Sequence, residues 1–441
     1  MNFRIWILCF ICISNVKAQD NIELDNLFKT IVRIDYDDIL NDSLSSVFDD
    51  ICDKKVILLG EMVHTDETTQ LMKNRIIKLL HEKYNYNVLI EETSFFNTSL
   101  NYKTLKSNDE FKWFYAAIKG DYSLSNSEIE RIDYLWNTKI KQDTLHYFGL
   151  DIWISNNRQI TFNFIDSILN KFGHYIVSDL DREKVEKYIL SYDIEFLVEH
   201  YSFFDDTINK ILYYYQEKDV AFQILKNIRA FYEYKVNSSE SKNVNKYNNS
   251  GKIFDSYLTR DKQMADNVFW LLKYKYPNEK IIISTSTYHI SKNLEQIKSK
   301  NKFFNTGVPM GQYLYNQYKD SIYTIAFIIG EGNVGFFKNN CSNNKYSKEI
   351  FSKLPTKKSR IESILIDRGY NYAFATFNQN ISNEMSFYMH PTFHKSYKYN
   401  WSNVYESLFF IKEAKPIHQK SIFCLYSSKH HESIKEFINQ F

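Results

Sequence analysis

The fold is decided by residues 56–92, VILLGEMVHTDETTQLMKNRIIKLLHEKYNYNVLIEE. The apolar runs at 56–59 and 87–90 end at Gly60 and at a pair of glutamates, and short apolar runs bounded in this way are typical of buried strands. Between them, apolar side chains recur at helical spacing and predict a helix over 68–84. A strand, a helix and a second strand at this spacing form a βαβ unit, so the two strands are expected to be parallel.

The rest of the chain extends this pattern. We expect further strands over 145–151, 280–283, 322–329, 372–377 and 421–426, and helices over 21–53, 162–172, 183–192, 208–215, 220–234 and 259–274. The predicted fold class is α/β, a mostly parallel mixed sheet flanked by helices, with a helical insertion or cap. The expected division is residues 1–18 as a signal peptide, 19–155 as the first part of the α/β domain, 156–250 as the cap and 251–441 as the second part.

Composition excludes several classes of protein. The 441 residues carry 55 Lys and Arg against 53 Asp and Glu, a net charge of +2, which argues against a nucleic-acid-binding protein and a strongly cationic membrane binder. The chain has only 11 Gly and 5 Pro, which argues against a collagen-like protein and against a turn-rich all-β protein.

The N-terminus predicts export. Arg4 precedes an apolar run at 5–13, and Val16–Ala18 offers a small-residue cleavage site, as in a secretory signal peptide. We therefore expect the periplasm or the medium as the location, with no membrane attachment after cleavage; an uncleaved anchor is the alternative. Beyond the leader, Cys52, Cys341 and Cys424 match no zinc-site spacing and are interpreted as incidental.

Polar side chains follow four of the predicted strands. They are Glu61 and His64 after the first, Glu91 and Glu92 after the second, Asp151 after the third, and the segment Ser284–His289 after the strand at 280–283. Ligands of open parallel sheets bind at the carboxyl ends of strands, so this clustering predicts a site there.

Each of these features also has a plain structural interpretation. A carboxylate three residues from an imidazole can orient the ring and raise its basicity, but Glu61 could equally complement a helix N-terminus. Adjacent glutamates on a strand point to opposite faces, so only one of Glu91 and Glu92 can reach a given site. A lone histidine such as His289 is usually structural.

Other motifs are rejected. Residues 330–335 match GxGxxG, but no amphipathic helix follows to receive a pyrophosphate. The sequence contains no HExxH, GxSxG or Walker motif. The histidines near the C-terminus match no metal-site spacing and are interpreted as surface residues; they are His390, His394, His430 and His431.

Several segments together resemble the erythromycin esterase family of hydrolases. They are VILLGEMVHTDETTQLMKNRIIKLL, NVLIEETSFF, YFGLDI, TRDKQMADNVFWLL, KIIISTSTYHISKN, MGQYL and YTIAF, in that order. The resemblance spans roughly residues 50–330. Members of the family are metal-independent esterases that open a macrolide lactone with water, a reaction of antibiotic resistance.

The resemblance implies site residues and chemistry. By position, Glu61, His64, Glu92 and His289 match the catalytic set, with His64 as the general base. The ungapped spacing from His64 selects Glu92 rather than Glu91. The resemblance also implies substrate-binding roles for further residues at basic or acidic positions of its motifs; they are Lys73, Arg75, Asp151 and Arg260.

The chain departs from the family pattern in two places. Ser286 stands where the family often has a first histidine of H-N-x-H, and Thr68 stands where an acidic residue is usual, with Glu67 beside it. We therefore expect a small-molecule ester or lactone as substrate and no cofactor. Two alternatives stay open: a hydrolase that uses a divalent metal at the same Glu and His cluster, and a non-catalytic protein that binds a hydrophobic ligand.

Overall fold

The computed structural model describes residues 24–34, 43–100, 123–154, 158–172, 178–243, 250–297, 307–340, 345–353, 360–379, 386–392 and 395–421. The predicted signal peptide lies outside these ranges, as do Cys341, Cys424 and three of the C-terminal histidines. No helix within these ranges is long and apolar enough to cross a membrane.

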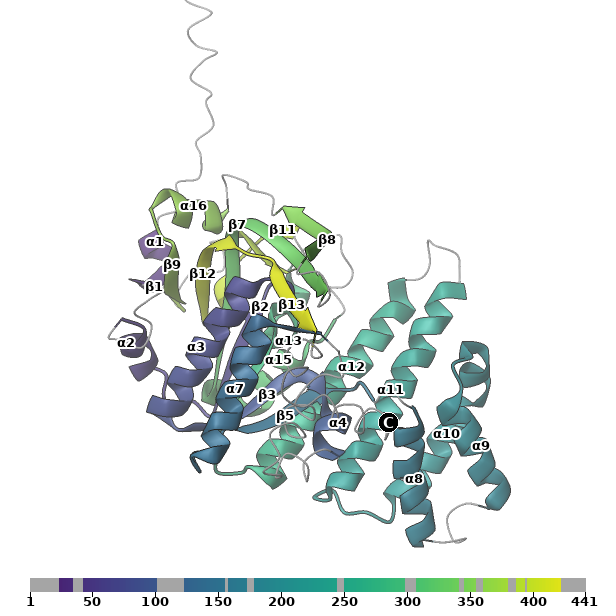
Figure 1. Ribbon diagram of the computed structural model, residues 1–441. Helices are drawn as coiled ribbons and strands as arrows, with labels where there is room; N and C mark the ends of the chain where they lie inside the picture. The colour runs from purple at the N-terminus through teal and green to yellow at the C-terminus, as the bar shows by residue number, and fades with distance from the viewer. Residues whose placement is uncertain are drawn as a thin grey trace, which may run out of the picture.

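A large sheet forms the centre of the molecule (Figure 1). Its strand order is β1-β9-β12-β7-β2-β6-β3-β5. The strands from β12 to β5 are all parallel to their neighbours, whereas β9 and β1 at one edge pair antiparallel. The predicted fold class, an α/β protein with a mostly parallel mixed sheet, is therefore confirmed.

The strands of this sheet and its extensions have the following bounds: β1 Phe28–Arg33, β2 Val56–Glu61, β3 Tyr86–Ser94, β4 Ser123–Ser125, β5 His146–Asp151, β6 Lys280–Ser286, β7 Ile322–Asn340, β8 Lys345–Lys353, β9 Tyr372–Phe377, β12 Ser407–Ala414 and β13 Ile417–Ser421. A separate two-stranded sheet contains β10 Phe387–Thr392 and β11 Lys395–Tyr399.

The helices that precede or flank the sheet are α1 Leu24–Leu27, α2 Ser43–Asp49, α3 Glu67–Tyr84, α4 Phe95–Leu100, α7 Asn126–Ile140, α12 Ser250–Trp270, α13 Thr287–Ile290, α15 Met310–Tyr318 and α16 Ile361–Asp367. Short helical turns lie at η2 Leu271–Lys275, η3 Leu294–Gln296, η4 Lys319–Ser321 and η5 Trp401–Asn403.

The sheet is covered on both faces. Along β2, Ile57 and Leu59 belong to a core that includes side chains of α3 and α7, whereas Val56 and Leu58 belong to a core on the other face, with side chains of α12, α13 and α15. Alternate residues of a strand point to opposite faces, so a strand covered on both faces is apolar throughout. This is why residues 56–59 are an uninterrupted apolar run.

A group of helices extends from one end of the sheet (Figure 1). It consists of α8 Arg158–Phe172, α9 Asp179–Leu190, α10 Ile194–Leu212 and α11 Val220–Asn243. Its core is aromatic: Tyr188 stacks on Phe204 with ring centroids 4.5 Å apart, and Tyr232 lies 4.9 Å from Phe204. The described residues of the expected cap, 156–250, thus form helices and no strand.

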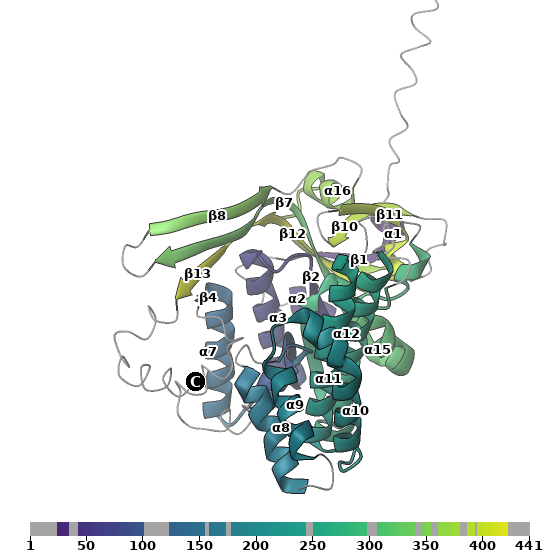
Figure 2. The same cartoon turned by 90° about the vertical axis from the view of Figure 1, so that its right-hand side faces the viewer.

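The second half of β7 leaves the main sheet with β8 and β13 (Figure 2). Two backbone hydrogen bonds hold the segment that follows β2. Gly335 N of β7 donates to Thr65 O over 3.1 Å, and Glu67 N donates to the O of Lys415, which lies between β12 and β13, over 2.8 Å. Asp66 caps α3 by accepting from the amides of Thr68 and Thr69. The loop that carries His64 is therefore fixed at its C-terminal side.

Several sequence-based expectations differ from the structure. Residues 28–33 were expected to be helical but form the edge strand β1, because pairing with β9 outweighs a weak helical periodicity. The strand expected over 322–329 is the first half of β7, and β7 itself passes through the GxGxxG motif at 330–335. Of the strand expected over 421–426, only Ser421 is described, as the last residue of β13.

Candidate active site

The predicted polar residues meet at the carboxyl ends of four neighbouring strands. Glu61 ends β2, Glu92 lies near the end of β3, Asp151 ends β5, and His289 lies on α13 directly after β6. The order β2-β6-β3-β5 places these ends side by side. Gly60 allows this approach, because a Cβ there would come within 2.8 Å of the Thr287 backbone of α13.

Glu61 is buried and links His64 to a buried lysine. Its Oε1 lies 3.0 Å from His64 Nδ1, and its Oε2 forms an ion pair with Lys73 Nζ, which also donates to Thr285 O over 3.4 Å. Lys73 is 2% exposed, whereas 64% of the His64 side chain is exposed. The anchored carboxylate thus holds an imidazole that solvent can reach.

Glu92 lies at the centre of the cluster. Its Oε1 is 2.7 Å from Arg260 Nη2, 3.4 Å from His289 Nε2 and 4.0 Å from His64 Nε2. Its Oε2 accepts from Thr285 Oγ1 over 2.7 Å and from the Ser286 amide over 3.1 Å. Ser286, which stands where the family often has a histidine, therefore contributes its backbone N–H to the position of Glu92.

Arg260 bridges Glu92 and Asp151. Its Nε and Nη2 bind the two oxygens of Asp151 over 3.0 and 2.6 Å, a bidentate arrangement. Its Nη1 makes no hydrogen bond recorded among the described residues, and 13% of the Arg260 side chain is exposed. This N–H group can therefore donate to an oxygen atom of a bound molecule.

His289 lies between two carboxylates. Asp261 Oδ1 is 2.7 Å from its Nδ1, and Glu92 Oε1 is 3.4 Å from its Nε2. Asp261 is completely buried on α12 and also accepts from the Met310 amide over 2.8 Å. Because an ionised carboxylate can only accept hydrogen bonds, both ring nitrogens of His289 are expected to be protonated.

The charges in the cluster stabilise one another. Burial lowers the pKa of His289, but Asp261 and Glu92 outweigh it and raise this pKa to about 10. Burial raises the pKa of Glu92, yet His289, with smaller contributions from His64 and Arg260, holds it well below its ordinary value. Burial likewise raises the pKa of Glu61, and Lys73 and His64 lower it overall. Both glutamates are therefore anions at neutral pH.

Buried amide side chains hold the cap against this edge of the sheet. Asn267 of α12 donates to Leu150 O over 2.9 Å and to Asn227 Oδ1 over 2.8 Å, and Asn227 of α11 donates to Ile152 O over 3.0 Å. Gln223 and Gln263 donate to Asn267 Oδ1 over 2.7 and 2.9 Å. The end of β5, which carries Asp151, is thereby fixed to two helices.

Other candidates lie elsewhere. Glu91 points away from the cluster and pairs with Arg131 of α7 over 3.0 Å. Glu67 accepts from the Ser127 amide over 2.8 Å, at the start of α7. Arg75 lies two residues after Lys73 on α3, so it leaves the helix on a different face. Lys73, expected to bind substrate, instead pairs with Glu61.

The structure adds Asp261 to the residues singled out from the sequence. Asp261 directly follows Arg260 in the RDKQMADN segment. The available signal was a charged residue within a helix whose apolar residues face the core, since such a residue is buried only when it is paired.

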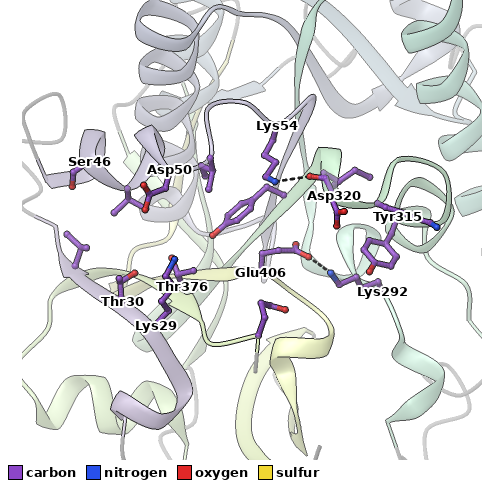
Figure 3. A pocket seen from close by; sticks show the side chains of 17 residues that line it. Lys29, Thr30, Ser46, Asp50, Lys54, Lys292, Tyr315, Asp320, Thr376 and Glu406 are labelled. Atoms are coloured by element: carbon purple, nitrogen blue, oxygen red, sulfur yellow. Dashed lines mark hydrogen bonds and ion pairs between the residues drawn. The ribbon is translucent and has the colours of Figure 1, made fainter. Parts of the chain in front are cut away.

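A cavity of about 590 Å³ lies at the opposite edge of the sheet, where β7 begins (Figure 3). Its charges are nearly balanced, with Lys29, Lys54, Lys292 and Lys319 against Asp50, Asp320 and Glu406. Lys292 pairs with Glu406, and Lys54 donates to the backbone carbonyl of Asp320 over 2.8 Å. None of the residues predicted for the site lines this cavity.

The cluster also contains a set of atoms with metal-ligand chemistry. One ligand atom each from Glu61, His64 and Glu92 lies within 4.8 Å of the others. Both carboxylates are already paired, however, with Lys73 and with Arg260. A divalent ion would be repelled by this ammonium and this guanidinium, so the donor set fits a metal poorly.

Comparison with known proteins finds similar sequences and similar folds. A family model described as Erythromycin esterase matches residues 199–402. An erythromycin esterase, EreC, has the same fold, with a TM-score of 0.61 and 14% identity over 88% of this chain and 98% of that one. The chain is thus similar to the erythromycin esterase family in part of its sequence and in its fold.

Further relatives of this erythromycin esterase-like chain are known. One, from Bacillus subtilis (strain 168), is named "Putative hydrolase YbfO"; it is 26% identical over 325 residues, which are 69% of this chain and 70% of the relative. The crystal structure of a succinoglycan biosynthesis protein is similar in fold, with a TM-score of 0.67 and 15% identity over 91% of this chain and 98% of that one. The family match includes Arg260, Asp261 and His289, whereas Glu61, His64 and Glu92 precede it.

Proposed function

We propose that this erythromycin esterase-like chain is a hydrolase that uses water to open carboxylic esters or lactones. The observation that carries the proposal is an exposed imidazole, His64, held on one side by an ionised carboxylate and facing a second carboxylate across 4.0 Å. That separation is too long for a direct hydrogen bond and suits a water molecule between His64 Nε2 and Glu92.

His64 acts as the general base. Glu61 accepts a hydrogen bond from Nδ1–H of His64, so that Nε2 carries the lone pair that takes a proton from water. The resulting hydroxide attacks the carbonyl carbon. When the C–O bond of the ester breaks, the leaving alcohol oxygen takes the proton back from His64. Glu61, kept anionic by Lys73, stabilises the imidazolium between these two steps.

Arg260 stabilises the developing oxyanion. Its Nη1 donates to the carbonyl oxygen, while its bonds to Asp151 and Glu92 fix the guanidinium before substrate arrives. A donor fixed in advance costs no reorganisation during the reaction, and such donors contribute roughly 10²–10³-fold in rate. His289 is a positioning residue for Glu92, because its ring lies between that carboxylate and Asp261.

The test is hydrolysis of a panel of carboxylic esters and lactones, monitored by acid release. Single-turnover reactions in ¹⁸O-labelled water should place the label in the product acid and leave the protein unlabelled. Label in a glutamate side chain of the protein would indicate that this carboxylate attacks the ester and that water then cleaves the resulting anhydride at the protein carboxyl carbon, which would contradict direct attack by water.

A metal-dependent hydrolase at the same residues is the second candidate, favoured by the convergence of Glu61, His64 and Glu92. We further propose export to the periplasm or the medium, from the leader at residues 1–18. N-terminal sequencing of protein recovered from cell fractions tests this: a chain in the cytosol that still begins at Met1 would contradict it.

A further inference from the structure

One aromatic side chain, Trp153, stands next to Arg260 on the side of the cap, and two further rings contact it. Trp153 follows β5 two residues after Asp151, and its ring centroid is 5.7 Å from Arg260 Cζ. Phe231 and Tyr234 of α11 lie edge-on to it, with centroids 6.1 and 5.4 Å away. We call Trp153, Phe231 and Tyr234 the aromatic wall. No step of the proposed reaction uses these residues.

The backbone behind the aromatic wall is fixed. Ser94, at the end of β3, donates through its hydroxyl to Trp153 O, and Asn227 holds the preceding carbonyl of Ile152. The amide cluster around Asn267 ties α11 to the same strand end. The strand ends that position Glu92 and Asp151 therefore also position Trp153, so the wall and the reacting groups form one preorganised unit.

The exposure of the wall differs along its length. Phe231 is 6% exposed and supports the other two rings from behind. Trp153 and Tyr234 are only half-buried, although both belong to a group of rings in edge-on contact. Half-buried aromatic side chains beside a polar cluster offer apolar surface that a ligand can cover.

We propose that the aromatic wall is a substrate subsite, and that this chain prefers esters carrying an aromatic ring next to the ester group. The inference rests on the proposed function for its reacting groups. A carbonyl oxygen bound by Arg260 brings the adjacent part of the substrate near Trp153, whose ring centroid is 5.7 Å from Arg260 Cζ, and Tyr234 lies beside Trp153. An aromatic ring there extends the edge-on arrangement that these side chains already show.

The experiment compares an aromatic substrate with a small one in each protein. The rates of hydrolysis of methyl 2-naphthoate and of ethyl acetate are measured for the wild type and for the variants Trp153→Ala, Trp153→Phe and Tyr234→Ala. We expect the ratio of kcat/KM for the naphthoate to that for the acetate to fall about 10-fold in Trp153→Ala and Tyr234→Ala, mainly through a higher KM for the naphthoate. In Trp153→Phe, which keeps an aromatic ring, the ratio should stay within about threefold of the wild-type ratio. Comparing this ratio between proteins cancels the different intrinsic reactivities of the two esters and any loss of activity common to both.

Tyr213→Ala is the matched control, because it removes an aromatic ring of the cap that is 87% exposed. Its ratio should equal that of the wild type. An unchanged ratio in Trp153→Ala and Tyr234→Ala, in variants that unfold at the wild-type temperature, would overturn the proposal.

A binding measurement separates this inference from the proposed function. 2-Acetylnaphthalene has the ring and the carbonyl but no ester bond, and calorimetry measures its Kd whether or not any ester is hydrolysed. Trp153→Ala should weaken its binding about 10-fold. Weakened binding without turnover of any ester would retain the subsite and reject the hydrolase, whereas equal binding by wild type and Trp153→Ala would reject the subsite.

Discussion

Replacing His289 by glutamine should destabilise the protein by an amount that falls as the pH rises. The imidazole lies between Asp261 and Glu92, which raise its pKa from 6.5 to about 10 against the opposing effect of burial. Because the folded-state pKa exceeds the unfolded one, this stabilisation is fully present below about pH 6.5 and is lost as the pH rises through 10. At about 1.36 kcal/mol per pH unit, it contributes on the order of 4 kcal/mol at pH 7.

The assay is thermal unfolding of wild type and His289→Gln at pH 6, 8 and 10. The difference in unfolding free energy should be largest at pH 6, smaller at pH 8 and smallest at pH 10. His200→Gln is the control, since His200 is half-buried on α10, and its effect should not follow this trend. A gap between wild type and His289→Gln that stays constant from pH 6 to pH 10 would refute the argument that the ring is held as a cation.

Two further predictions concern the residues that support the site, and a third concerns its need for a metal. Lys73→Met should lower the unfolding free energy by about 3–5 kcal/mol, because it leaves the Glu61 carboxylate buried without its cation; Lys78→Met, on the exposed face of the same helix, should have little effect, and equal losses in both variants in chemical denaturation would contradict this. Asn267→Ala should cost on the order of 3 kcal/mol, because it leaves buried amide and carbonyl groups without partners; a thermal-unfolding temperature like that of the wild type would show that the amide cluster does not hold the cap. Ester hydrolysis should survive dialysis against EDTA, and a loss that Zn²⁺ or Mn²⁺ restores would support the metal-dependent alternative.

Much of the fold follows from local sequence pattern. The runs at 56–59, 87–90 and 280–283 are apolar on both faces, so their burial in the middle of a parallel sheet could be predicted from composition and length. The central strand β12 could not, although Leu408–Ile411 has the same character. An apolar run of four residues is compatible with a strand or a buried helical segment, and only pairing with β7 and β9 decides between them.

In the candidate site, too, part of the arrangement could be predicted from local sequence pattern and part depends on how the elements pack. Strand ends in a parallel sheet lie at one edge, so the approach of Glu61, Glu92 and Asp151 could be expected from order along the chain. The pairing of Asp261 with His289 could not be expected, because the two residues are 28 positions apart and their contact depends on how α12 packs against α13. Sequence pattern places a residue on an element, whereas an ion pair between elements depends on their packing.

The most direct test of the account is the activity of His64→Ala. His64 has an exposed side chain, so its removal should leave the unfolding temperature unchanged. Loss of a general base should lower kcat/KM for ester hydrolysis by roughly 10²–10⁴-fold. A folded His64→Ala protein that hydrolyses the same esters as fast as the wild type would contradict the assignment of the active site.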